Sequence, residues 1–206
     1  MLYSCLPIWA CDFNKKLENL ELRIQETKQV LNHESLDNIH IVKQHITLMT
    51  DIDQIARKLF IKDQNNEQIR QIIQEIDRFH TTHLKAILEI HHWISISRFG
   101  KEADNQAWLL VQHADHDPAF QVSCLAVLEP LVPLEETDKK NYAYLYDRTA
   151  PMRGLKQRFG TQVNIDSTHV ELLPYEGTLE NVNKCRKEIG LEPVELYLQT
   201  IRRVYH

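Results

Sequence analysis

The richest concentration of side chains capable of chemistry lies between residues 112 and 162. It begins with the run Gln112-His113-Ala114-Asp115-His116-Asp117-Pro118, followed by Gln121. It continues with Asp147-Arg148 and ends with Gln157 and the segment Phe159-Gly160-Thr161-Gln162. These residues combine groups that transfer protons, a guanidinium that binds anions, and neutral amides that orient a ligand. We therefore predict that they form one polar pocket.

His113 is the main candidate for proton transfer. In the pattern His113-x-Asp115-x-Asp117, alternate side chains of an extended link point the same way. A carboxylate beside an imidazole raises the pKa of the imidazole and fixes its tautomer, which is how a general base is oriented. Capping of the neighbouring helices by His113 and Asp117, and metal ligation, are open alternatives. In the catalytic hypothesis, His113 performs acid/base chemistry and Asp115 orients the His113 ring. Asp147 is the third predicted catalytic residue.

Arg148 is the candidate for anion binding, because its planar guanidinium matches a carboxylate or a phosphate. The alternative is a structural ion pair within Asp147-Arg148. Glutamine is a poor choice for a buried strand, and Gly160 lets the backbone approach a ligand closely. The predicted substrate-binding residues are Gln112, Gln121, Arg148, Gln157, Thr161 and Gln162.

Other kinds of site have weaker support. His80 and His83 supply only two ligands at helical spacing, so we interpret them, with His91 and His92, as a solvated helix face. We predict no metal site, because a catalytic zinc needs three well-placed protein ligands. Phosphate loops, dinucleotide fingerprints and serine elbows are missing from the sequence, which disfavours nucleotide hydrolases, dehydrogenases and serine hydrolases, and we predict no cofactor. Ser123 and Cys124 lie in an apolar helical stretch and are predicted to belong to the core.

The composition is that of a globular protein. Of 206 residues, 43% are apolar and 26% charged, and the net charge is −5. Residues 101–150 hold four Lys or Arg and nine Asp or Glu, and no basic stripe carries interleaved aromatic residues, so we expect no nucleic-acid partner. The four scattered cysteines predict free thiols and a cytoplasmic location. Met1–Cys11 is apolar but short and lacks a basic leader, so it is a poor signal peptide, and we expect no membrane partner.

The first ninety-nine residues should be helical, because Pro7 is the only proline or glycine among them. Apolar residues recur at helical spacing over 13–31 and again over 39–59, which predicts two long amphipathic helices. A third helix should begin at Ile69, and a fourth is predicted from about Leu84 to Trp93.

The second half contains all five glycines and shorter elements. Helices are predicted at 107–111, at 118–131 after an Asp117 cap, at 141–148, at 178–188 and after Pro193. Segments 156–163 and 169–173 predict one β-hairpin. The expected fold class is mainly α, an antiparallel helical bundle or stacked helices with this small hairpin near residues 156–173.

Several motifs together resemble an uncharacterised bacterial family, domain of unknown function 6624. They are Asp53-Gln54-x-x-Arg57, Asp77, Trp93, Phe99-Gly100, Gln112-His113-Ala114-Asp115, Gln121, Asp147-Arg148, Gly154-x-x-Gln157, Phe159-Gly160-Thr161-Gln162, Pro174, Asn183-x-x-Arg186 and Gly190-Leu191. The resemblance covers about residues 45–199 and implies membership without implying a reaction. His92-Trp93-Ile94 stands where the family has Gly-Trp-Pro, which predicts continued helix in place of a turn. Residues 1–44 fall outside the resemblance, so we expect a helical arm over 1–44 and a mainly helical domain over 45–206.

Two functions from different classes follow from these observations. The first is a hydrolase or group-transfer enzyme that acts on a small polar or peptide-derived substrate. The second is a helical module that binds a protein partner or a second copy through its N-terminal helices. A closed network around Asp147 would favour the module, whereas an open concavity reaching His113 would favour the enzyme.

Overall fold

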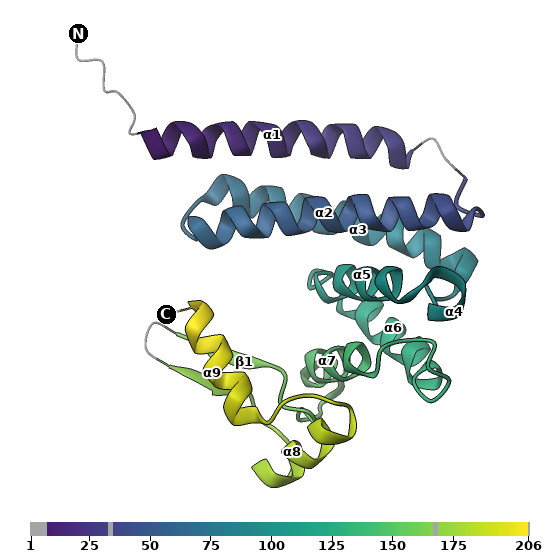
Figure 1. The fold of residues 1–206 in the computed structure, drawn as a ribbon, viewed down its shortest axis with the longest axis vertical. Coiled ribbons are helices and arrows are strands. Elements are labelled where there is room, and N and C mark those ends of the chain that lie inside the picture. Colours follow the sequence, from purple (N-terminus) through teal and green to yellow (C-terminus); the bar gives the residue numbers. More distant parts are fainter. Residues whose placement is uncertain (1–7, 33–34, 167–168, 206) are drawn as a thin grey trace. The chain divides into compact units, whose positions relative to one another are not determined.

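The computed structural model describes the backbone of residues 8–32, 35–166 and 169–205, and the side chains of residues 13–32, 35–166 and 169–203. The chain divides into two compact units, Met1–His92 (unit 1) and Trp93–His206 (unit 2). The predicted fold class, mainly α with one small hairpin, is confirmed (Figure 1).

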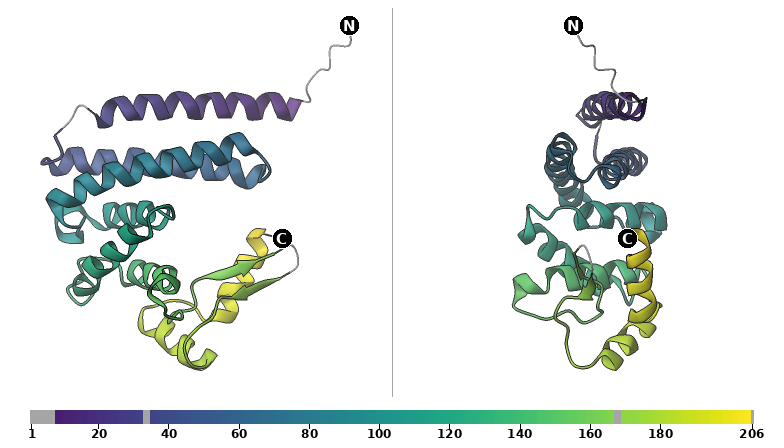
Figure 2. Two further views of the ribbon diagram at one scale, coloured as in Figure 1. Left: turned by 180° about the vertical axis from the view of Figure 1, so that it is seen from behind. Right: turned by 90° about the vertical axis from the view of Figure 1, so that its left-hand side faces the viewer.

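Unit 1 contains three long helices in its described part: α1 (Ile8–Leu31), α2 (Ile39–Lys62) and α3 (Glu67–His91). Figure 2 views them nearly end on in its right panel, where α2 and α3 lie beside each other. Asn38 and Asn66 begin α2 and α3 by accepting hydrogen bonds from backbone N–H groups of the first turn. The apolar stripes of the three helices form one core, whose buried members are Leu17, Leu20, Ile24, Ile52, Ala56, Leu59, Ile69, Ile73 and Ile76.

The prediction that no strand occurs between Phe13 and Trp93 is confirmed for the described residues. The prediction of two separate helices after Ile69 is wrong, because α3 runs without interruption for 25 residues. No proline or glycine interrupts this stretch, and His80 and Thr81 are buried, with 3% and 4% of their surface exposed, where the apolar pattern lapses. The buried side chains of His80 and Thr81 therefore continue the inner face of α3 where apolar residues stop recurring.

Helix α3 ends at His91, and His92 adopts φ 63° and ψ −52°. The predicted continuation of helix through His92-Trp93-Ile94 is therefore wrong. The chain makes its turn here with a histidine in a conformation that favours glycine. The backbone thus keeps the turn that a glycine would make at this point.

The helices of the described part of unit 2 are shorter. They are α4 (Ile96–Phe99), α5 (Lys101–Gln112), α6 (Pro118–Leu131), α7 (Lys139–Thr149), the 3₁₀ turn η1 (Pro151–Arg153), α8 (Leu179–Glu188) and α9 (Val194–Tyr205). The predicted cap at Asp117 is confirmed, because its carboxylate accepts a hydrogen bond from the Phe120 N–H at 3.1 Å. Thr178 and Asn181 form a capping box that begins α8.

The hairpin consists of β1 (Val163–Ile165) and β2 (Val170–Leu172), which pair antiparallel with Asn164 opposite Glu171. The predicted first strand over 156–163 is wrong except at its last residue. Gln157 forms only an isolated bridge with Tyr175, and Gly160 turns the backbone at φ 60°. Residues 157–162 are instead a loop held by buried side chains.

Among the described residues, no helix is long and apolar enough to cross a membrane. Cys124 and Cys185 are free thiols, whereas Cys5 and the side chain of Cys11 lie outside the description. Cys124 is buried, as predicted for the core, but Ser123 is exposed and the prediction for it is wrong. Ser123 lies on the solvent side of α6, where its hydroxyl donates to the Ala119 carbonyl oxygen at 2.9 Å.

Candidate functional site

Helices α5 and α7 pack in parallel, and this packing brings the first two groups of predicted site residues together. Three contacts join residues exactly thirty-six positions apart. Asn141 Nδ2 donates to Asn105 Oδ1 at 2.9 Å, and Arg148 Nε donates to the Gln112 carbonyl oxygen at 2.9 Å. Between them, the rings of Trp108 and Tyr144 meet edge to face with centroids 5.9 Å apart.

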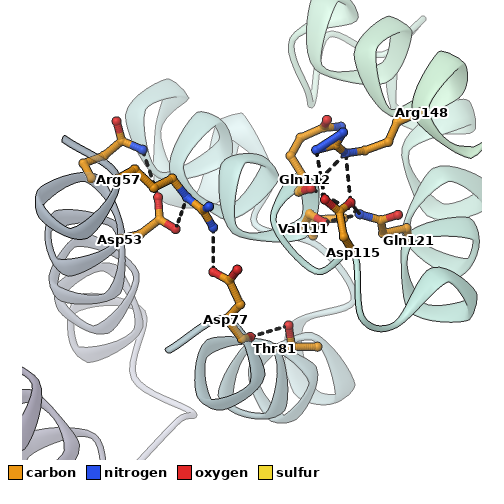
Figure 3. A network of polar contacts seen from close by, with 10 residues as sticks. Asp53, Arg57, Asp77, Thr81, Val111, Gln112, Asp115, Gln121 and Arg148 are labelled. Atoms are coloured by element: carbon orange, nitrogen blue, oxygen red, sulfur yellow. Dashed lines mark hydrogen bonds and ion pairs between the residues drawn. The ribbon is translucent and has the colours of Figure 1, made fainter. Parts of the chain in front are cut away.

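Arg148 is the centre of a cluster that includes Gln112, Asp115, Gln121 and Gln162, which we call the Arg148 cluster. Figure 3 shows Arg148 together with Gln112, Asp115 and Gln121. Its Nη2 lies 3.3 Å from Asp115 Oδ2, and its Nε also lies 3.3 Å from Asp115 Oδ1. Nη1 donates to Gln162 Oε1 at 3.3 Å. The Arg148 side chain is 27% exposed and that of Asp115 is 66% exposed, so the cluster is open to solvent on the Asp115 side.

Gln121 fixes the position of Asp115 from helix α6. Its side chain is 2% exposed, and its Nε2 donates to the carbonyl oxygens of Val111 and Gln112 at 3.1 and 3.2 Å. The same nitrogen lies 3.1 Å from Asp115 Oδ1. Because the last carbonyls of a helix lack intrahelical partners, this buried amide closes the end of α5 and holds the acidic residue that follows it.

Gln112 contributes more than a backbone acceptor. Gln112 is 6% exposed, and its Nε2 is buried with no hydrogen-bond partner among the described residues. A buried donor without an acceptor costs about 1–3 kcal/mol. The Arg148 cluster therefore has a donor for which the described chain supplies no acceptor.

Asp147 lies next to Arg148 on α7 but points into the interior, with 1% of its surface exposed. It accepts hydrogen bonds from the backbone N–H groups of Arg158, Phe159 and Thr161 at 2.7, 3.1 and 2.9 Å, and from Thr161 Oγ1 at 3.0 Å. Burial raises the pKa of Asp147, while these hydrogen bonds act in the opposite direction. The contacts are those of a side chain that organises the loop of residues 157–162.

Gln157 and Thr161 are buried in the same loop, each with 3% of its surface exposed. Gln157 Nε2 donates to the carbonyl oxygens of Gln162 and Leu173 at 3.0 and 2.6 Å, and its Oε1 accepts from the Gln162 N–H at 2.9 Å. Gln162 Nε2 donates to Thr161 Oγ1 at 3.1 Å. Gln162 therefore joins this closed network to the Arg148 cluster.

His113 is the C-cap residue of α5, one position after Gln112, and it is partly exposed. The Asp115 carboxylate that was expected to orient the His113 ring bonds to Gln121 and Arg148. Of the nine predicted site residues, the structure joins eight by hydrogen bonds and places His113 beside them along the chain. Their catalytic and substrate-binding roles stay predictions.

Two buried charged residues of unit 2 also hold the elements of the site, although the sequence analysis gave them no role. Asp104 is fully buried and accepts from Trp93 Nε1 and Thr137 Oγ1 at 2.8 Å each, which fixes the start of α7 against α5. Burial raises the pKa of Asp104. Arg186 is also fully buried, and its Nη1 donates to the carbonyl oxygens of Phe159 and Gly160 at 2.9 and 3.0 Å.

Unit 1 has polar contacts of its own between α2 and α3. The predicted pairing of Arg57 with Asp53 is confirmed at 2.9 Å, and Arg57 Nη2 also reaches Asp77 Oδ1 at 2.6 Å (Figure 3). His45 Nδ1 lies 3.0 Å from His83 Nε2. Burial, and secondly the charge of His45, lower the pKa of His83 to about 4.

The interpretation of the histidines of α3 as a solvated face is wrong for His80 and His91, which are buried. The rings complete the inner stripe of the helix, and His91 Nε2 lies 2.6 Å from the Leu36 carbonyl oxygen. Among the described residues, no group of three or more His, Cys, Asp and Glu side chains is placed to hold a metal ion.

Fold and site together define a mainly α-helical protein whose second unit carries a part-exposed arginine cluster braced by a buried loop. The family model described as "Family of unknown function (DUF6624)" matches residues 40–206, and the chain belongs to this family. No curated protein and no solved structure matches the chain.

Proposed function

We propose that unit 2 binds a small polar or peptide-derived ligand at the Arg148 cluster and acts on it as a hydrolase or group-transfer enzyme. The observation that carries this proposal is that the Arg148 guanidinium is both fixed by its neighbours and accessible to solvent. Its guanidinium is held from three directions, by Gln112, Asp115 and Gln162, and yet it is 27% exposed. A guanidinium fixed before binding loses little side-chain entropy when it binds a carboxylate or a carbonyl oxygen.

The charge of the cluster favours a singly charged or neutral ligand. Asp115 already offsets the charge of Arg148, so a polyphosphate would meet a site with no excess of positive charge. A carboxylate or an amide carbonyl carries at most one negative charge and needs less compensation from the site. These requirements are met by amino acids, N-acyl amino acids and short peptides.

The chemical step in this proposal belongs to His113, which lies one residue from Gln112 and two from Asp115. An imidazole can both accept and donate a proton, which suits general acid/base catalysis. Asp147 acts through the loop that it holds, so we assign it a positioning role within the proposed enzyme. In this proposal the reaction takes place in the cytoplasm and uses neither a metal nor a cofactor.

Binding is tested by NMR on the Nε–H resonances of the arginines. Acetate, N-acetylalanine, the dipeptide Ala-Ala and inorganic phosphate would be the probes. We expect N-acetylalanine or Ala-Ala to shift the Arg148 resonance saturably, with Arg158, an exposed arginine of the same unit, as internal control. If all four probes leave Arg148 unmoved, or move it no more than Arg158, the binding proposal fails.

Catalysis is tested with His113→Gln, and with His116→Gln as a matched control from an exposed position three residues further on. Dipeptides and dipeptide amides would be screened for release of free amine by the wild-type protein. A general acid/base contributes about 10²–10⁴-fold to rate, so His113→Gln should lose that much while His116→Gln keeps its activity. Equal activities of the two variants would remove His113 from the mechanism.

A second candidate, a non-catalytic interaction module, is favoured by one observation. Asp147, Gln157 and Thr161 are at least 97% buried and form a closed network with backbone groups of the loop. If binding at Arg148 is absent but a protein partner or a second copy binds through the helices of unit 1, this candidate replaces the enzyme.

A further inference from the structure

A basic groove runs between α1 and α2 on one side of unit 1. It encloses about 280 Å³, and the side chains that line it include five cations and no carboxylate among the described residues. The cations come from both helices. The lining consists of Lys15, Lys16, Asn19, Arg23, Ile55, Lys58, Leu59 and Lys62.

The basic groove differs in charge from the groove on the other side of α1. That second groove, between α1 and α3, is lined by Glu18, Glu21 and Glu75 with Lys28 as the one lysine among the described lining residues. Lys15, Lys16 and Arg23 of α1 thus line the groove toward α2, whereas Glu18 and Glu21 line the groove toward α3 together with Lys28. A solvated helix with evenly mixed charges would not produce this separation.

The helix dipole explains only a part of the basic groove. Cations are favoured in the last turn of a helix, which accounts for Lys62 at the end of α2. Lys15, Lys16 and Arg23 lie in the body of α1, beyond the reach of its dipole. From Lys15 to Arg23 the cations of α1 extend over roughly 12 Å of helix.

Apolar surface next to the cations favours a membrane surface over a nucleic acid or an acidic peptide. Ile55 and Leu59 line the groove among the cations, and Ile61, three residues after Lys58 and outside this lining, is 55% exposed. Apolar residues that insert between lipids, next to cations that meet anionic headgroups, are the combination that holds a protein at a bilayer surface.

We propose that the basic groove of unit 1 binds the anionic headgroups of a membrane surface. The protein would lie on the bilayer without crossing it, at the cytoplasmic leaflet, where acidic lipids are concentrated. This inference departs from the expectation of no membrane partner drawn from the sequence. It is independent of the function proposed for unit 2.

The test is co-sedimentation of the full chain with vesicles of phosphatidylcholine alone and with vesicles that contain 30% phosphatidylserine. One basic residue near an anionic surface changes the partition about fivefold. The triple variant Lys15→Gln, Lys58→Gln, Lys62→Gln should therefore bind the anionic vesicles about 100-fold more weakly. The matched control is Lys156→Gln, Lys184→Gln, Lys187→Gln, which neutralises three exposed lysines of unit 2 and should bind like the wild type.

We expect wild-type binding to the anionic vesicles only, and its loss at 0.5 M salt, where the Debye length falls below about 5 Å. Equal binding to both kinds of vesicle, or equal binding by the two triple variants, would overturn the proposal. So would the lack of vesicle binding together with binding of an oligonucleotide or a poly-glutamate peptide that the first triple variant loses, because the groove would then serve a different polyanion.

Discussion

From the contact between His45 and His83 we predict how the free energy of unfolding depends on pH. The two imidazoles lie 3.0 Å apart, nitrogen to nitrogen, and His45 is fully buried. A hydrogen bond between two neutral imidazoles uses one donor and one acceptor, whereas two imidazolium ions would oppose each other. Burial, and then the charge of His45, accordingly lower the pKa of His83 from 6.5 to about 4.

The sign of the effect follows from where the proton binds. As the pH falls below 6.5, the unfolded chain takes up a proton at residue 83 that the folded chain refuses until the pH approaches 4. The free energy of unfolding should therefore decrease between pH 6.5 and pH 4. It should stay constant, as far as this residue is concerned, outside that interval.

The size of the stability loss depends on how far the pKa of His83 is lowered and on how exposed its ring is. A lowering from 6.5 to about 4 corresponds to an upper limit of about 3 kcal/mol. His83 is only partly buried, so solvent screens a share of this penalty. We expect a loss of about 1–2 kcal/mol between pH 7 and pH 4 that depends on His83.

The assay is urea unfolding followed by circular dichroism at pH 4, 5, 6 and 7. His83→Gln cannot titrate, so its stability should depend on pH less steeply than that of the wild type. His40→Gln is the control, because His40 is an exposed residue of α2 in the same unit. Parallel pH curves for His83→Gln and the wild type would refute the reasoning, as would an NMR titration of His83 with its midpoint near 6.5.

Three further predictions concern the backbone turn and the carboxylates of unit 2. His92→Gly should raise the melting temperature by about 2–4 °C, because glycine adopts φ 63° without the cost of about 1–2 kcal/mol that a side chain incurs there; a lower melting temperature in a thermal scan would contradict this. Asp147→Asn should lower the free energy of unfolding by about 1–3 kcal/mol, since the amide turns an N–H group toward backbone donors; a loss below 0.5 kcal/mol in urea titrations would show that the loop does not depend on the carboxylate. Asp115→Asn, at a side chain that is 66% exposed, should cost less than about 1 kcal/mol in the same titrations, and a cost equal to that of Asp147→Asn would mean that the pairing of Asp115 with Arg148 is structural.

Local signals in the sequence predicted much of the fold. Apolar spacing and the lack of glycine and proline predicted α1 and α2, and Asp117-Pro118 predicted the start of α6. The pairing of Asp53 with Arg57 also follows from helical spacing. These features depend on residues within one or two helical turns of each other, and such interactions are visible in a sequence.

Features that depend on distant residues were not predictable in this way. The continuity of α3 depends on buried His80 and Thr81, which an apolar pattern counts as a break. The conversion of the expected strand over 156–163 into a loop depends on hydrogen bonds that backbone N–H groups of the loop donate to Asp147, which lies eleven to fourteen residues earlier. A search for buried carboxylates followed by a glycine-containing polar segment could have suggested this contact, but periodicity could not.

The loop of residues 157–162 explains why some predicted site residues, such as Asp147, are buried while Arg148 is partly exposed. The buried carboxylate of Asp147 accepts from N–H groups of Arg158, Phe159 and Thr161, while the buried guanidinium of Arg186 donates to the carbonyl oxygens of Phe159 and Gly160. The peptide groups of the turn thus lie between a negative and a positive charge, so each charge is compensated by backbone dipoles without a direct ion pair.

Gly160 fits this turn because a Cβ atom there would lie 3.0 Å from Val182 Cγ1 and φ is 60°. A backbone fixed on both sides holds Gln162 in one place, and Gln162 Oε1 is one of the acceptors that fix Arg148. The buried residues therefore determine the geometry of the exposed guanidinium. Substitution of Asp147 or Arg186 should disturb the proposed binding at Arg148 through the loop, without either residue touching a ligand.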